Sequence, residues 1–195
     1  MRSSLTDTGA STTAVSVADF KLHARIYHTQ DDTPLANTVL AATQVIEHET
    51  HRALITRSFV LSLAGFPECG EVILPKSPMV SVTSITYVDA AGATQTLSSS
   101  VYHTYSVNGV GRVVLKTTAS WPSTLGTGGM DVTITFTAGY GSTAASIPAS
   151  LVHAVLLQGS HMYEIRTSVN IGSVANEIPM TVQRLIAQYH TGDYA

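Results

Sequence analysis

The hydrophobic residues of this chain change their spacing twice. Over residues 35–46 and 151–163 they recur every three or four positions, which is the spacing of one face of an α-helix. From residue 54 to about residue 139 they recur every second position, as in strands that bury one face. Helices at both ends of the chain with strands between them predict an α+β fold.

Two helices are predicted before the strands. Ser16 followed by Asp19 is typical of a capping box and begins a short helix that ends near Tyr27. Its apolar residues are Val17, Phe20, Leu22, Ala24 and Ile26. Acidic residues and a proline at 31–34 then begin a second helix that runs to about residue 50.

Two further helices are predicted after the strands. Pro148 begins one that is apolar nearly all round, so it has to be surrounded by other elements or by another subunit. Residues 177–179 open the last helix, in which four apolar residues share one face: Val182, Leu185, Ile186 and Tyr189.

The strand region shows alternation and tight turns. In residues 132–138 the apolar side chains face one way and three threonines face the other. Asn108 and Gly109 predict a hairpin because both tolerate a positive φ, and residues 89–92 predict another. The prolines of this region, Pro67, Pro75 and Pro78, are expected at strand ends or edges.

These patterns predict a helical bundle formed by the N- and C-terminal helices and interrupted by an antiparallel β sandwich or barrel-like insertion. The expected parts are a flexible N-terminal arm (1–15), the first bundle helices (16–53), the β module (54–141), the last bundle helices (147–190) and an exposed tail (191–195).

Charged residues are scarce. They make up 12% of the 195 residues, against about a quarter in an ordinary soluble chain. Some of the surface is therefore expected to be covered by partners, most simply by identical copies. The alternative is a monomer whose surface is coated with Ser, Thr, Asn and Gln. The net charge is −3 and the ten basic residues are scattered, unlike the footprint of a nucleic-acid binder.

The single cysteine, Cys69, can form no intramolecular disulfide and is expected as a small buried or edge thiol. The first residues lack the apolar core of a signal peptide, and no stretch approaches the roughly 20 apolar residues of a membrane span. We therefore expect a protein made in the cytoplasm, not exported by the Sec route and not bound to a membrane.

Three motifs resemble chemical sites, and each lacks a necessary part. Residues 47–51 space their histidines by three rather than the four of the zinc-protease motif. Residues 159–161 lack the glycine pattern of a nucleophile elbow, and Gly159 is better explained by close helix packing. Residues 126–129 lack the lysine of a phosphate loop. We predict no enzyme, cofactor or metal site, and a hydrolase ranks last among the hypotheses.

A binding module is the main alternative to a structural role. Aromatic residues on a β sandwich can line a carbohydrate or receptor groove, although each is also a common core or rim residue. The candidates are Trp121, Tyr87, Tyr102, Tyr105 and Tyr140.

In order along the chain, the motifs resemble the head-tail connector, or adaptor, proteins of long-tailed phages and phage-like gene transfer particles, in the connector family with a β-rich insertion. The likeness covers about residues 17–190. It is carried by residues 52–59, 65–75, 78–92, 111–113, 121–122, 132–141, 147–148, 154–157 and 163–164.

This resemblance implies a structural protein of the virion neck with no active site. It implies a homo-oligomeric ring, dodecameric in assembled particles, between the portal and the tail stopper or tail-completion protein. Double-stranded DNA would pass through the lumen during packaging and ejection without sequence-specific binding.

Portal contact is a further hypothesis, because a ring subunit needs an exposed element to reach the next ring. We expect the C-terminal helix and tail, residues 179–195, to supply it. The candidate residues are Pro179, Arg184, Gln188, Tyr189, His190, Asp193 and Tyr194.

Overall fold

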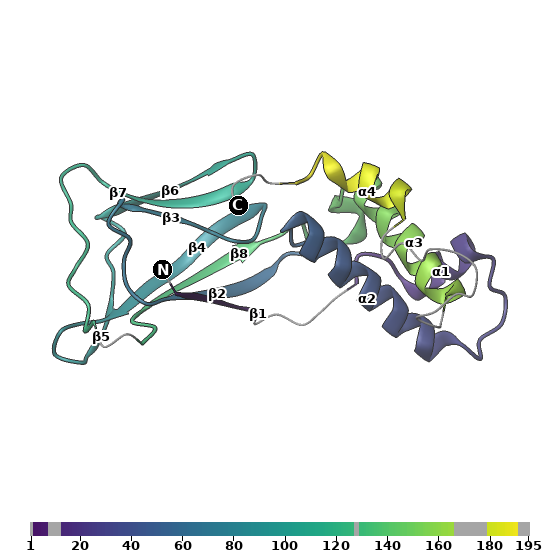
Figure 1. The fold of residues 1–195 in the computed structure, drawn as a ribbon, viewed down its shortest axis with the longest axis horizontal. Helices are drawn as coiled ribbons and strands as arrows, with labels where there is room; N and C mark the ends of the chain where they lie inside the picture. The colour runs from purple at the N-terminus through teal and green to yellow at the C-terminus, as the bar shows by residue number, and fades with distance from the viewer. Residues whose placement is uncertain (1, 8–12, 127–128, 166–178, 191–195) are drawn as a thin grey trace. The chain divides into compact units, whose positions relative to one another are not determined.

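The computed structural model describes residues 2–7, 13–126, 129–165 and 179–190. It divides the chain into two compact units, with boundaries between Ile55 and Thr56 and between Gly139 and Tyr140 (Figure 1). We call residues 2–7 and 56–139 the β unit, and the described residues of 13–55 and 140–190 the helical unit. The predicted α+β class is confirmed: helices from both ends of the chain pack together, and antiparallel sheets lie between them in the sequence.

The helical unit consists of four α-helices and one short 3-10 helix among the described residues. They are α1 (Val17–Ala24), α2 (Asp32–Thr50), η1 (Ala144–Ser146), α3 (Ala149–Glu164) and α4 (Met180–Ala187). The capping box of α1 is confirmed, because Ser16 Oγ accepts from the Asp19 amide at 3.0 Å and donates to the Asp19 carboxylate at 2.6 Å. α1 ends earlier than predicted, at Arg25, whose φ of 56° is left-handed.

One core holds the helical unit together. It includes Phe20 of α1, Leu35, Val39 and Ile46 of α2, Leu151 and Val155 of α3, and Val182 and Ile186 of α4. α3 packs against each of the other three helices, which is the surrounding that its apolar sequence requires. Gly159 permits this packing, since a Cβ there would lie 2.7 Å from Phe20 Cε2.

The β unit contains two antiparallel sheets. The five-stranded sheet has the order β1 (Ser3–Asp7), β2 (Arg57–Leu63), β8 (Val132–Ala138), β4 (Met79–Val88) and β5 (Thr94–Thr96). The three-stranded sheet has the order β3 (Glu71–Ile73), β7 (Val110–Leu115) and β6 (Tyr102–Val107). In β8 the apolar residues are buried and the threonines half-buried, and Phe59 of β2 stacks on Phe136 with ring centroids 5.6 Å apart.

Both predicted hairpins are present. Asn108 and Gly109, with φ of 53° and 86°, join β6 to β7 with Val107 opposite Val110. Residues 89–92 join β4 to β5, and Gly92 has a φ of 84°. The three prolines of this region lie outside the strand interiors, and Pro78 directly precedes β4.

Three expectations need correction or refinement. The predicted flexible arm is wrong for residues 3–7, which form β1 against β2, and for Ala14 and Val15, which are buried. β1 is exposed at every residue, so it has no hydrophobic alternation by which a sequence could reveal it. Leu22, expected on the apolar face of α1, is 76% exposed. Cys69 is exposed beside the edge strand β3 rather than buried.

Candidate functional site

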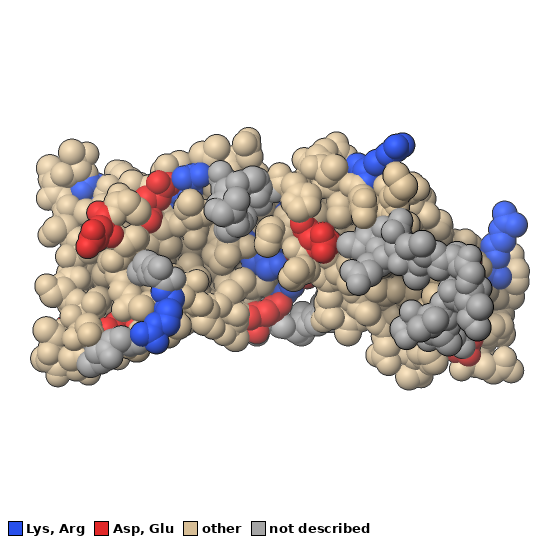
Figure 2. All heavy atoms as spheres, viewed as in Figure 1, with Lys and Arg blue, Asp and Glu red and all other residues tan. Residues whose placement is uncertain are grey.

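The surface carries few charges, as the composition predicts. On the face drawn in Figure 2, Lys, Arg, Asp and Glu side chains are isolated or in small groups, separated by wide uncharged areas. Several of these charges are already used within the fold, in the ion pairs Lys21–Asp32, Arg57–Asp7 and Arg112–Glu71. The candidate functional surfaces are therefore the uncharged ones and the exposed part of α4.

The helix α4 and the residues directly flanking it contain most of the predicted portal contacts. Pro179 caps its N-terminus and is half-buried, while Arg184, Gln188 and His190 are exposed. Val182 and Ile186 are buried in the helical core, with Leu185 and Tyr189 packed against it. Asp193 and Tyr194 lie outside the described residues. Among the described candidates, Arg184 is exposed on α4 and Gln188 and His190 are exposed just after it.

Tyr189 has a role inside the helical unit. Arg52 is buried and donates from Nε to the Tyr189 carbonyl at 2.9 Å and from Nη1 to the Tyr140 hydroxyl at 3.0 Å. Its guanidinium also lies within 6 Å of both ring centroids. The Tyr189 hydroxyl shares a hydrogen bond of 2.7 Å with Ser150 of α3. Arg52 therefore holds the end of α4 against the rest of the helical unit.

The electrostatics of this cluster follow from its burial. Burial raises the pKa of the Tyr140 phenol above the ordinary tyrosine value, and the charge and hydrogen bond of Arg52 oppose that rise. Sequence reasoning missed the cluster because its members are far apart in the chain. One clue was available: a single arginine directly after a long helix in a chain with few charges.

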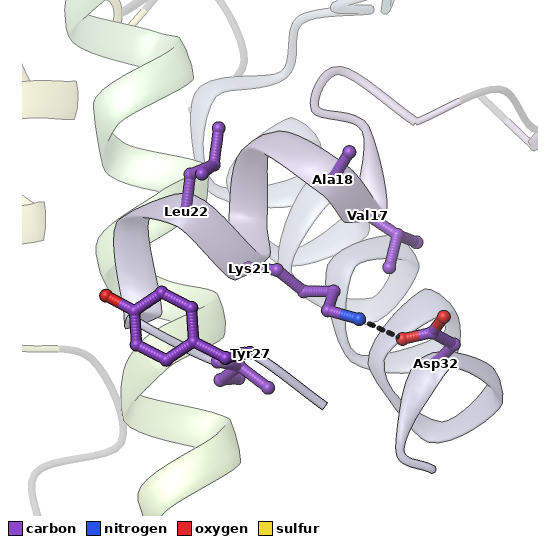
Figure 3. A pocket seen from close by; sticks show the side chains of 7 residues that line it. Val17, Ala18, Lys21, Leu22, Tyr27 and Asp32 are labelled. Atoms are coloured by element: carbon purple, nitrogen blue, oxygen red, sulfur yellow. Dashed lines mark hydrogen bonds and ion pairs between the residues drawn. The ribbon is translucent and has the colours of Figure 1, made fainter. Parts of the chain in front are cut away.

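An apolar groove lies beside α1 (Figure 3). It has a volume of about 500 Å³ and is lined by Val17, Ala18, Lys21, Leu22, Ile26, Tyr27 and Asp32. Lys21 and Asp32 form an ion pair of 2.6 Å across one side, which leaves the apolar part uncharged. Leu22 and Tyr27 are 76% and 88% exposed, the largest exposures among the big apolar side chains of the described residues. Such a surface is typical of one covered in an assembly.

Two of the motifs that resemble chemical sites lie at the end of α2 and within α3. His48 and His51 have ring centroids 6.3 Å apart, and Ser160 and His161 lie within α3. Within the described ranges, no three His, Cys, Asp or Glu side chains gather as metal ligands. No helix in those ranges is long and apolar enough to cross a membrane.

The aromatic residues of the carbohydrate-groove hypothesis come from different elements of the chain. Trp121 stacks on Phe66 at 4.6 Å, and Tyr87 meets the edge of the same ring at 5.9 Å. Tyr102 and Tyr105 lie on β6, and Tyr140 belongs to the helical unit. Of the five candidates, Trp121 and Tyr87 share Phe66 as an aromatic neighbour.

Comparison with known proteins gives matches at the level of structure. No protein-family model and no curated protein sequence matches the chain. Three solved chains each align with 96% of this chain over 95% of their own length. One belongs to the virion of a native gene transfer agent particle, with 30% identity and a TM-score of 0.81. The others belong to the neck of the empty particle computed with C6 symmetry (29%, 0.80) and of the native particle computed with C12 symmetry (29%, 0.78).

Proposed function

This chain belongs to the family of these gene transfer agent particle components, and from that premise we propose that it is a structural head-tail connector of a virion neck. In this role it forms a ring between the portal and the tail stopper or tail-completion protein. The observation that carries the proposal is the alignment over nearly the full length of both chains, at 30% identity and a TM-score of 0.81.

A ring of identical copies agrees with the surface of the chain. Each copy in a ring is flanked by two neighbours, so much of its surface is buried in the assembly and needs little charge. The exposed Leu22 and Tyr27 and the uncharged areas of Figure 2 are surfaces of this kind. The solved neck of the similar native particle was computed with C12 symmetry, which supports twelve copies as the stoichiometry.

DNA passage requires a ring lumen that does not bind the DNA duplex tightly. A net charge of −3, with ten basic residues scattered along the chain, gives little attraction for phosphates. The proposed role also needs no catalytic group. The role consists of contacts with other proteins and of letting DNA pass without binding it tightly.

The portal contact is proposed for α4 and the residues that follow it. Arg184, Gln188 and His190 are exposed there, and Arg52 holds the end of the helix through the Tyr189 carbonyl. A fixed helix with exposed polar side chains can present the chain end to a neighbouring ring.

Truncation tests this contact. We expect deletion of residues 191–195, combined with Arg184→Gln, to lower portal binding at least tenfold in a pull-down or interferometry assay. Arg25→Gln is the matched control, because it also removes one exposed arginine from the helical unit. Undiminished binding by the truncated chain would contradict the portal assignment.

Genetic removal tests the function as a whole. Cells lacking this chain are expected to accumulate DNA-containing heads and separate tails, and a tagged chain is expected at the head–tail junction by electron microscopy. Intact particles without the chain would rule out a connector. Measurable glycan affinity together with absence from the neck would favour the binding-module alternative.

A further inference from the structure

Among the described residues, the strand β6 is a sheet edge without the usual protecting features. It ends the three-stranded sheet, and five of its six residues are exposed. It contains no proline and no Lys, Arg, Asp or Glu, and Tyr105 and Val107 are 45% and 44% exposed. A long uncharged edge readily pairs with another strand, so monomeric proteins normally protect such edges.

The other three sheet edges of the described β unit carry some protection. β3 and β5 have only three residues each. β3 also carries Glu71, paired with Arg112 at 2.6 Å, and β1 ends in Asp7, paired with Arg57 at 2.5 Å. Short strands and edge charges both discourage pairing with foreign strands. β6 has neither feature, and β1 is the other edge long enough to pair extensively.

The register shows which backbone groups of β6 face outward. A two-residue hairpin closes on a hydrogen-bonded pair, here Val107 and Val110, and bonded and non-bonded pairs then alternate. Gly111 O bonds to Leu74 N and Leu115 N bonds to Gly70 O, so both point away from β6. Their partners Ser106 and Tyr102, and Thr104 between them, therefore direct their N–H and C=O groups to the open edge.

The same reasoning applies to β1. Ala64 N donates to Arg2 O at 3.1 Å, which makes that pair hydrogen-bonded and the next pair, Ser3 with Leu63, non-bonded. Ser3, Leu5 and Asp7 thus direct their backbone groups outward.

The two edges lie on opposite sides of the β unit. In Figure 1, β1 lies in the lower part of the β unit and β6 along its upper side, and the two strands are edges of different sheets. A closed ring requires two different, complementary surfaces on opposite sides of each copy. Pairing of β6 with β1 uses both edges of every copy, whereas a partner of another sequence on one edge would leave the other open.

We propose that β6 of one copy pairs edge to edge with β1 of the next copy, so that strand addition joins the three-stranded sheet of one subunit to the five-stranded sheet of its neighbour. The interaction rests on the proposed function, because it supposes a ring of this chain. Main-chain hydrogen bonds would supply the contact, as in other strand-addition interfaces.

Proline substitution at outward-facing residues tests the pairing. Thr104→Pro and Leu5→Pro each remove one outward N–H and leave the existing ladder intact. In analytical ultracentrifugation under reducing conditions, the wild type is expected to form species larger than a dimer as its concentration rises. Each variant alone should remain monomeric, and an equal mixture should stop at a heterodimer through the one intact edge of each chain.

The controls separate edge blockage from misfolding. Thr104→Ala and Leu5→Ala keep the amide and are expected to associate like the wild type, and circular dichroism checks the fold of every variant. If Thr104→Pro does not fold, Thr104→Lys places a charge on the same edge. The proposal is overturned if the wild type stays monomeric, if the blocked variants associate normally, or if Leu5→Pro dimerises alone through β6.

Measuring how much of each variant enters the particles distinguishes a failure of edge pairing from a failure of the connector role. Loss of both self-association and incorporation supports the pairing. A folded Thr104→Pro chain that still enters the neck in full amount overturns edge pairing and leaves the connector role standing.

Discussion

Arg52 shows how one residue can organise distant parts of this chain. Its side chain bonds to Tyr140 and to the backbone of Tyr189, which are 88 and 137 positions away in the sequence. Because Arg52 is buried, these partners replace the water that its charge would otherwise bind. The end of α4 therefore depends on a residue that no local pattern connects with it.

We predict that Arg52→Ala lowers the free energy of unfolding by about 2–3 kcal/mol, because it leaves the Tyr189 carbonyl and the Tyr140 hydroxyl without this donor. Urea denaturation measures the change. Tyr140→Phe is the matched control, since it removes only one of the two acceptors and should cost less. Equal stability of the wild type and Arg52→Ala would show that the cluster does not stabilise the fold.

Gly159 matters through packing, because it lies directly against the ring of Phe20. We predict that Gly159→Ala destabilises the chain by about 1–2 kcal/mol, because the clash with buried Phe20 exceeds the gain in helix propensity. Gly65→Ala is the control, since its new Cβ would lie 3.8 Å from the nearest atom. Thermal unfolding compares the two, and a stabilised Gly159→Ala protein would contradict the packing role.

Individual elements differ in how clearly their sequences encode them. The strand β8 and the hairpin at Asn108 are encoded locally, by alternation and by residues that tolerate positive φ. The turn after β4 is encoded by Asp89, whose carboxylate accepts the amides of Ala91 and Ala93, each at 2.9 Å, and Gln95 Nε2 at 3.0 Å. Asx turns of this kind act within a few residues.

This turn gives a pH prediction. The hydrogen bond from the Ala93 amide, followed by that from Gln95, holds the pKa of Asp89 below the ordinary aspartate value. A lowered pKa stabilises the folded turn above the unfolded value of about 3.9, and that stabilisation is lost as the pH falls through the folded value. Amide exchange in β5, corrected for its intrinsic pH dependence, should therefore increase in acid.

Asp89→Asn provides the control for this prediction. The amide cannot titrate, so the additional acid sensitivity of β5 should disappear in the variant. An unchanged acid response would assign it to another group.

At the scale of the whole molecule, the chain consists of two units with separate cores. Phe20 and Leu151 belong to the core of the helical unit, and Phe59 and Phe136 stack within the β unit. Gly111 is the packing glycine of the β unit, because a Cβ there would lie 2.5 Å from Met79 Sδ and 2.7 Å from Met79 Cβ.

We predict that Gly111→Ala lowers the stability of the β unit by about 1–3 kcal/mol through overpacking. Hydrogen exchange should then increase in β3, β4 and β7, while α2 and α3 keep their protection. Gly159→Ala should give the reverse pattern. Uniform loss of protection in both variants would show that the two units unfold together.

Much of the fold was predictable from local information. Helix periodicity, the Ser16 capping box, proline positions and strand alternation depend on neighbours within a few residues, so the α+β class and most helices and strands follow from the sequence. β1 was not predictable, because an exposed strand is defined by its partner β2 rather than by its own pattern.

The candidate functional surfaces also combine features that the sequence predicts with features that only the fold reveals. Composition and residue spacing are properties of the chain alone, and they already indicate little charge to present to water and no chemical motif with its necessary parts. The folded structure was needed to show that Leu22 points outward, that Arg52 holds Tyr189, and that β1 and β6 are the longest edge strands among the described residues. These features depend on residues far apart in the sequence meeting in space, and no local pattern records which ones will meet.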